Sequence, residues 1–206
     1  LLLRLASPVP PPNTAPGVVL TGTNTNASED AYGLDVFGVP LIDPVSYDDS
    51  LLGTDGNDAI YGLDGNDVVD AGLGNDVVYV GNHNDNLRGQ AGDDALFGGE
   101  GRDSLSGAEG ADTLDGGRGR DYLFGGADSD TYLLGRDSGF DTIYEGYADA
   151  GMDTLRLAAD VLPNAVSLYR DGNDLIVVLD QGANQVRVTE RYLCKPTYDT
   201  WRADYI

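Results

Sequence analysis

Residues 89–124 read GQAGDDALF, GGEGRDSLS, GAEGADTLD and GGRGRDYLF, four consecutive nine-residue segments with one shared pattern. The period extends in both directions, so that Asp recurs at every ninth position from residue 58 to residue 130. An apolar or aromatic residue follows each aspartate by two positions, and glycine precedes seven of the nine by two positions. A strict period of this kind is typical of a chain wound into a solenoid.

The repeat itself predicts the local structure. The first six residues, rich in glycine, are expected to turn sharply, and the last three to form a short strand with its middle residue pointing inward. Two repeats then make one coil, and the turns of repeats i and i+2 stack on one edge, about 4.7–4.9 Å apart. The sequence therefore predicts an all-β protein: a right-handed parallel β-roll with a C-terminal antiparallel β cap.

Stacked turns of this composition bring carboxylates and backbone carbonyls together. Calcium takes six to eight such oxygen ligands with flexible geometry, whereas magnesium prefers a tighter octahedron. Zinc favours His and Cys, and the chain has one of each. The expected calcium ligands are the periodic aspartates and the glycines two positions before them: Asp58, Asp67, Asp76, Asp85, Asp94, Asp103, Asp112, Asp121, Asp130, Gly56, Gly65, Gly74, Gly92, Gly101, Gly110 and Gly119.

The stacking also sets a limit on the number of ions. Pairing each repeat with the next but one gives at most about seven calcium ions, four along one edge and three along the other. The best-formed sites are expected to pair Asp58 with Asp76, Asp76 with Asp94, Asp94 with Asp112, and Asp103 with Asp121.

Some repeats depart from the pattern. Val80 and His83 replace glycines in the fourth repeat, where calcium sites are expected to be weak or absent; Ala71 and Asp128 replace glycines elsewhere. At the third position of four repeats an acidic residue either joins a site or faces water, and the sequence leaves both options open for Asp55, Asp64, Glu100 and Glu109.

Three regions follow from composition. Residues 1–50, with a cluster of prolines, are expected to be a linker and the trailing edge of an upstream module. Residues 51–145 form the roll, including a worn repeat at 136–144 that keeps Gly139, Asp141 and Ile143. Residues 146–206 are expected to cap the roll with strands at 154–157, 165–170, 175–180 and 185–193, a hairpin turn at 171–173, and an aromatic core of Tyr192, Tyr198, Trp201 and Tyr205.

The repeat strongly resembles the pattern GGxGxDxUx of the RTX, or haemolysin-type, calcium-binding family, over residues 53–133. Residues 153–193 also resemble the segment that follows these repeats in many members. The resemblance implies a parallel β-roll, calcium between turns, an extracellular bacterial protein, and export by type I secretion machinery with an uncleaved C-terminal signal, which the cap region is expected to overlap.

Composition narrows the remaining functions. With 35 acidic residues against 12 basic ones and a net charge of −23, nucleic acid is not an expected partner. No apolar run is long enough to span a membrane, and no catalytic motif occurs, so the chain is not expected to be an enzyme itself. It is expected to be a monomeric module whose calcium binding folds and stabilises a secreted protein. The alternatives are the C-terminal domain of an extracellular metalloprotease, lipase or toxin, and a non-catalytic surface adhesin or structural module.

Overall fold

The computed structural model describes residues 19–21, 48–145, 151–159, 161–179, 182, 184–190 and 202–204. Most of the expected linker, residues 1–50, and the four aromatic residues expected in the cap core lie outside the described residues. In the described part of the chain, no helix is long and apolar enough to cross a membrane.

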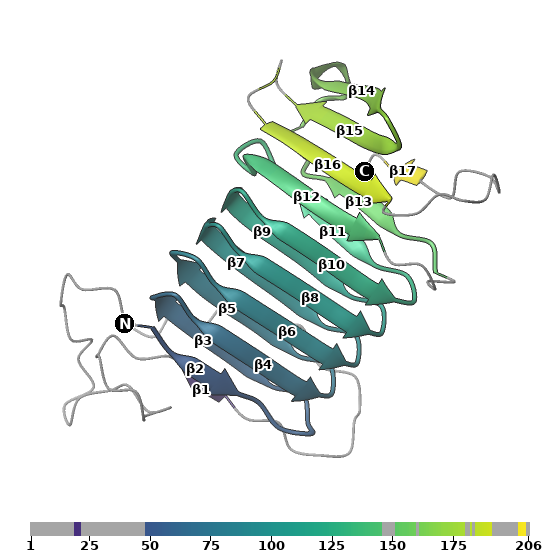
Figure 1. The fold of residues 1–206 in the computed structure, drawn as a ribbon. Helices are drawn as coiled ribbons and strands as arrows, with labels where there is room; N and C mark the ends of the chain where they lie inside the picture. The colour runs from purple at the N-terminus through teal and green to yellow at the C-terminus, as the bar shows by residue number, and fades with distance from the viewer. Residues whose placement is uncertain are drawn as a thin grey trace.

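Two sheets face each other and run the length of the molecule, which confirms the all-β parallel roll (Figure 1). The eight-stranded sheet has the order β1-β3-β5-β7-β9-β11-β13-β17, and the nine-stranded sheet has the order β14-β15-β16-β12-β10-β8-β6-β4-β2. The strands of the first sheet are β1 (Val19–Thr21), β3 (Ala59–Asp64), β5 (Val77–Asn82), β7 (Ala95–Gly101), β9 (Thr113–Gly119), β11 (Thr131–Leu134), β13 (Thr154–Leu157) and β17 (Arg202–Asp204). Those of the second are β2 (Ser50–Leu52), β4 (Val68–Leu73), β6 (Asn86–Ala91), β8 (Ser104–Glu109), β10 (Tyr122–Ala127), β12 (Phe140–Glu145), β14 (Val166–Asp171), β15 (Asp174–Leu179) and β16 (Asn184–Glu190).

The register of the sheets follows the repeat. Consecutive repeats alternate between the sheets, so each strand pairs in parallel with the strand two repeats away, as Val77 does with Ala95 and Ala95 with Thr113. Strand β1 adds a parallel partner to β3, although it falls within the region expected to be a linker. Val19–Thr21 carries no part of the nine-residue pattern that would have predicted it.

The core is a ladder of the residues at the eighth position of each repeat. Every one is buried: Ile60, Val69, Val78, Leu87, Leu96, Leu105, Leu114, Leu123 and Tyr132. Each rung brings a similar side chain over the one below, which removes apolar surface from water along the whole roll. The outer face of the first sheet adds a stack of Tyr61, Tyr79 and Phe97, with ring centroids 5.8 and 4.5 Å apart.

The strands are longer than the sequence predicts. Strand β4, for example, continues through Gly72 and Leu73, so that only residues 74–76 turn before β5. The reason is that backbone pairing needs no side chain: Gly81, Gly99 and Gly117 stay in register across β5, β7 and β9. The three-residue strand and six-residue turn expected for each repeat are therefore wrong.

The C-terminal segment is joined to the roll rather than being a separate sheet. Strands β14, β15 and β16 are antiparallel as predicted, with Asp171 paired to Asp174 across the expected hairpin turn. However, β16 also pairs in parallel with β12, and β13 pairs in parallel with β11. Both sheets of the roll thus continue into the cap, at the end marked by β14 and β15 in Figure 1.

Candidate calcium-binding edges

The nine periodic aspartates lie in two columns, each at the start of the strands of one sheet. The odd column consists of Asp58, Asp76, Asp94, Asp112 and Asp130, which precede strands of the eight-stranded sheet; the even column consists of Asp67, Asp85, Asp103 and Asp121, which precede strands of the nine-stranded sheet. All nine side chains are at most 3% exposed. An aspartate is rarely so buried unless it is paired or bound, which makes the two columns the candidate site.

One oxygen of each interior aspartate joins two coils. The backbone N–H of Asp76 donates to Oδ1 of Asp94 at 2.8 Å, and the N–H of Asp94 donates to Oδ1 of Asp112 at 2.8 Å. The even column repeats this contact, with the N–H of Asp85 donating to Oδ1 of Asp103 at 2.8 Å. Each carboxylate is therefore held in place by the coil that precedes its own.

The other oxygen has no hydrogen-bond donor. Oδ2 is buried and lacks a hydrogen-bond partner in Asp67, Asp76, Asp85, Asp94, Asp103, Asp112 and Asp121. A buried polar oxygen without a partner costs about 1–3 kcal/mol, and more when the group is charged. The regular recurrence of this cost along both edges points to a cation that the carboxylates bind.

The first glycine of the repeat borders the space beside Oδ2. A Cβ built on Gly98 would lie 2.6 Å from Oδ2 of Asp103 and 2.6 Å from the carbonyl oxygen of Gly116 in the next coil. A Cβ on Gly107 would collide with Oδ2 of Asp112 and lie 2.6 Å from the carbonyl oxygen of Gly125. These glycines were not among the predicted site residues, yet the space that they leave is lined by two oxygens of the kind calcium prefers.

The fourth-position glycines of the predicted set have a different role. Gly65, Gly74, Gly92, Gly101, Gly110 and Gly119 have positive φ, and a Cβ on Gly92 would collide with the carbonyl oxygen of Gly74 in the preceding coil. Gly56, in the first coil, is buried. These glycines let the backbones of successive turns approach closely and bring their carbonyls toward the column.

Burial shifts the ionisation of the columns. Burial, with a smaller contribution from nearby carboxylates, raises the pKa of Asp94 to about 8 despite the lowering effect of the Asp76 N–H. Burial likewise raises the pKa of Asp76, Asp85 and Asp103 to about 7 and that of Asp67, Asp112 and Asp121 to about 6. A bound cation reverses this effect, because it favours the charged form of each ligand.

The irregular fourth repeat keeps its place in the even column. Asp85 accepts from the N–H of Asp67 at 2.7 Å, and His83 is exposed in the turn with φ of 84°. Val80 and Ala71, however, are buried in the core and carry a Cβ at the position where the glycines of other repeats pack directly against Oδ2. The sites next to Asp76 and Asp85 therefore have the least room for an ion.

The third-position acids face outward. Asp55, Glu100 and Glu109 are exposed, and Glu100 lies 3.7 Å from the guanidinium of Arg118. Asp64 accepts from the side-chain amide of Asn82 at 2.5 Å. The structure thus places Asp55, Glu100 and Glu109 on the outer surface, whereas Asp64 is half-buried and its charge helps to raise the pKa of Asp67 in the even column.

Both columns extend beyond the predicted residues. The N–H of Asp49 donates to Oδ1 of Asp67 at 2.8 Å, which adds a coil at the start. At the end, Asp121 and Asp130 donate their N–H groups to Oδ1 of Asp141 at 3.1 Å and of Asp153 at 2.9 Å. The sequence carried a signal for each, because Leu51, Ile143 and Leu155 follow these aspartates by two positions as in every repeat.

The donor set fits calcium. Among the described residues, no group of three or more His, Cys, Asp or Glu side chains gathers at one point. Most ligands of an ion would therefore be backbone carbonyls, with one or two carboxylates. Calcium accepts such a set, whereas zinc requires nitrogen or sulfur ligands.

The family comparison agrees with this chemistry. The family model of the RTX calcium-binding nonapeptide repeat matches in four copies, over residues 45–78, 79–114 and 106–143. No curated protein matches the chain. Among solved structures, the crystal structure of the extracellular lipase LipA from Serratia marcescens is similar, with 19% sequence identity and a TM-score of 0.29. The likeness covers 77% of this chain and 40% of the lipase chain, so the chain spans less than half of that protein.

Proposed function

Residues 45–143 are RTX calcium-binding nonapeptide repeats, and from this premise we propose that calcium drives the folding of the roll and stabilises a secreted protein. The ions are proposed to lie beside Oδ2 of the aspartates in the odd and even columns. The observation that carries the proposal is the row of buried Oδ2 atoms without hydrogen-bond partners, from Asp67 to Asp121. Backbone carbonyls of the stacked first-position glycines, such as Gly107, Gly116 and Gly125, are proposed to supply further ligands.

Calcium would convert a destabilising feature into a stabilising one. Without an ion, each interior coil buries carboxylates whose pKa is raised by burial, and the chain carries a net charge of −23. Glycine at many turn positions adds a large entropy cost of ordering. We therefore expect the ion-free repeats to be unfolded, so that the free energy of calcium binding becomes free energy of folding.

The calcium affinity expected for such a module fits a secreted protein. Extracellular calcium modules bind at about 10⁻⁴–10⁻³ M, far above cytosolic levels. A chain with this affinity stays unfolded inside a bacterial cell, passes type I secretion machinery, and folds outside as a monomeric module. Which upstream module it serves, an extracellular enzyme, a toxin or an adhesin, is a further part of the hypothesis that only the preceding sequence decides.

A calcium titration followed by far-UV circular dichroism tests the proposal. The purified chain is first placed in chelator, then titrated from micromolar to 10 mM calcium, with magnesium as the control. We expect a cooperative coil-to-β transition with calcium and none with magnesium. A β spectrum in chelator that calcium leaves unchanged would show that the apolar ladder alone holds the roll.

A further inference from the structure

The backbone pairing of the eight-stranded sheet opens between β9 and β11. Pairing stops at Tyr132 and resumes only at Gly139, which lies beside Gly119. Across this gap, residues 115–118 of one coil lie opposite residues 133–138 of the next, because the repeat gains two residues here. The preceding pair, β7 and β9, is joined from end to end. The insertion therefore separates two coils that the regular repeat would hold together.

The opening contains a cavity of about 380 Å³. Small-molecule sites typically measure about 300–1,000 Å³ and are mostly apolar, with a few polar groups that orient the ligand. The apolar lining of this cavity includes Leu133, Leu134 and Leu157. Five charged residues also line it: Asp115, Arg118, Arg136, Asp137 and Arg156. None of the periodic aspartates is among the lining residues, so the cavity is separate from the candidate calcium-binding edges.

We propose that this cavity binds a small organic anion with an apolar group, such as an aliphatic carboxylate. Three guanidinium groups and two carboxylates line the cavity, in a chain whose acids outnumber its bases by 35 to 12. The local excess of positive charge attracts an anion to this place, although the net charge of the chain repels anions. The leucine side chains suit the aliphatic part of such a ligand.

Arg156 is the side chain expected to bind the anion. It lies on the outward-facing side of β13 beside Leu133 of β11, while the adjacent Leu155 points into the core. Its side chain forms no hydrogen bond or ion pair within the described part of the chain. A guanidinium binds a carboxylate through two parallel hydrogen bonds. An aliphatic carboxylate can therefore place its charge on Arg156 and its chain over Leu133.

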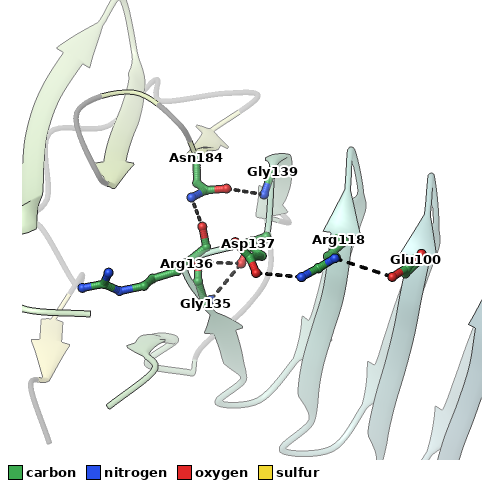
Figure 2. Close-up of polar contacts among 8 residues, drawn as sticks. Glu100, Arg118, Gly135, Arg136, Asp137, Gly139 and Asn184 are labelled. Atoms are coloured by element: carbon green, nitrogen blue, oxygen red, sulfur yellow. Dashed lines mark hydrogen bonds and ion pairs between the residues drawn. The ribbon is translucent and has the colours of Figure 1, made fainter. Parts of the chain in front are cut away.

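Arg118 already has acidic partners. Its guanidinium lies 2.8 Å from the carboxylate of Asp137 and 3.7 Å from that of Glu100, and Figure 2 shows it between the two acids. The Arg118–Asp137 pair contributes no net charge to the cavity. Among the lining residues, Arg136 and Arg156 then remain against the single carboxylate of Asp115.

The turn after β11 forms a wall of the cavity that is fixed by its own hydrogen bonds. The Ser138 hydroxyl accepts from the N–H of Gly135 at 2.8 Å and donates to its carbonyl at 3.0 Å. From the cap, the side chain of Asn184 accepts from the N–H of Gly139 at 2.9 Å and donates to the carbonyl of Arg136 (Figure 2). A wall that is already ordered lowers the entropy cost of binding a ligand.

Asp115 distinguishes an anion from a cation as the ligand. It is half-buried on the outer side of β9, and its Oδ1 accepts from the N–H of Gly117 at 3.1 Å. A bound amine would be attracted by this carboxylate, whereas a bound anion is repelled by it. Replacing Asp115 by Asn therefore changes the affinity for the two kinds of ligand in opposite directions.

Two-dimensional ¹H–¹⁵N NMR spectra of the full chain in 10 mM calcium test the inference. Hexanoate is the probe, and hexan-1-ol and hexylammonium are its neutral and cationic controls. We expect saturable shifts of the Gly117, Gly135 and Arg156 amides with hexanoate and no saturation with either control. Saturation by hexan-1-ol at the same concentration, saturation by hexylammonium, or no saturable shift with hexanoate would each overturn the inference. Calcium-dependent folding is measured separately by circular dichroism, so none of these results bears on the proposed function.

Three variants assign the binding to its residues. Arg156→Gln should weaken hexanoate binding about tenfold or more, because it removes a charge-assisted hydrogen bond. Arg88→Gln is the matched control and should leave the affinity unchanged, because Arg88 is exposed on the outer side of the other sheet and does not line the cavity. Asp115→Asn should tighten hexanoate binding. Equal affinities of the Arg156 and Arg88 variants, or weaker binding by Asp115→Asn, would contradict the anion site.

Discussion

Replacing Asp94 by Asn should change the stability of the roll in opposite directions with and without calcium. Asp94 lies in the middle of the odd column, 2% exposed, with Oδ1 accepting the N–H of Asp76. The amide oxygen of Asn can accept the same hydrogen bond, but the substitution removes the negative charge that lies beside the carbonyl of Gly107. The neighbouring Asp93→Asn is the matched control, because Asp93 is exposed and its Oδ1 accepts the N–H of Ala111, a bond that Asn also keeps.

In calcium, the variant is expected to be less stable. An ion that binds only the folded chain stabilises it by RT ln(1 + [L]/Kd), which is about 1.4–2.7 kcal/mol at 10 mM calcium for a Kd of about 10⁻³–10⁻⁴ M. Asp94 contacts the coils on both sides of its own, through Asp76 and Asp112. Its loss therefore weakens one or two ions, for a total of about 1.4–5.4 kcal/mol.

In chelator, the variant is expected to be more stable than the wild type. Burial raises the pKa of Asp94 to about 8, so at pH 7 the folded chain must hold this group neutral, at a cost of about 4 kcal/mol relative to an unfolded Asp. Asn avoids that cost, although its amide leaves a buried polar atom without a partner, worth about 1–3 kcal/mol. The net gain is about 1–3 kcal/mol in favour of the folded ion-free variant.

Two titrations measure the change in stability with and without calcium. Urea unfolding in 10 mM calcium gives the first, and trimethylamine oxide, which favours compact states, folds the chain in chelator for the second. Asp94→Asn should unfold at lower urea and fold at lower trimethylamine oxide than the wild type, while Asp93→Asn changes the free energy of unfolding by less than about 0.5 kcal/mol in either assay. Equal effects of the two variants in calcium would refute the assignment of Asp94 as a ligand.

Three further predictions concern pH, glycine positions and the core. In chelator with a fixed amount of trimethylamine oxide, the folded fraction should rise as pH falls from 8 to 5. Burial raises the pKa of the column carboxylates to about 6–8 in the folded chain, whereas it is about 3.9 in the unfolded chain. The folded state therefore holds its protons more tightly, and the stability that this provides is lost as pH rises through 6–8. A folded fraction that falls on acidification would contradict this reasoning. In calcium, protons compete with the ion, and the calcium midpoint should rise as pH falls. Gly117→Ala, where φ is 84° and a Cβ would collide with the Gly99 carbonyl, should lower the free energy of unfolding in the urea assay by about 2 kcal/mol or more. Ala108→Gly at the equivalent position, with φ of 93°, should raise it by about 1 kcal/mol. Leu105→Ala should cost about 2–5 kcal/mol in the same urea assay, with the outward-facing Ser106→Ala as its near-neutral control; equal losses would place the core elsewhere.

The period of the sequence was enough to predict the fold because it specifies both the core and the edges. Each repeat places one apolar residue inward, as Leu96 and Leu105 show, and one aspartate at the edge where that strand begins. What the period could not specify is how far each strand extends, because glycines at the second position pair through their backbone alone. Strand β7 thus runs on to Gly101, although its last residues have no strand-forming side chain.

The sequence also missed the different roles of the two glycines. Both positions read as turn residues, and only the structure separates Gly98, which leaves room beside Oδ2 of Asp103, from Gly101, which lets two backbones meet. The distinction matters for Ala71 and Val80, which replace the first kind and fill space, and for His83, which replaces the second and adopts φ of 84° without disturbing the column. A side chain at the first position therefore leaves less room for an ion, whereas a side chain at the fourth position strains the backbone.

The start of the odd column follows a different rule from the interior. In the interior, Oδ2 of the aspartate is buried without a hydrogen-bond partner, as in Asp94 and Asp103. At Asp58 the N–H of Thr54 donates to Oδ2 at 2.5 Å, and the Thr54 hydroxyl lies 3.1 Å from both carboxylate oxygens. At the first coil a protein donor thus takes the place that an ion is proposed to take in the interior. The odd column does not stop in this way at its other end, because the N–H of Asp130 donates to Oδ1 of Asp153 in the following coil. The row of ions is therefore expected to begin after Asp58, where Thr54 already satisfies the carboxylate.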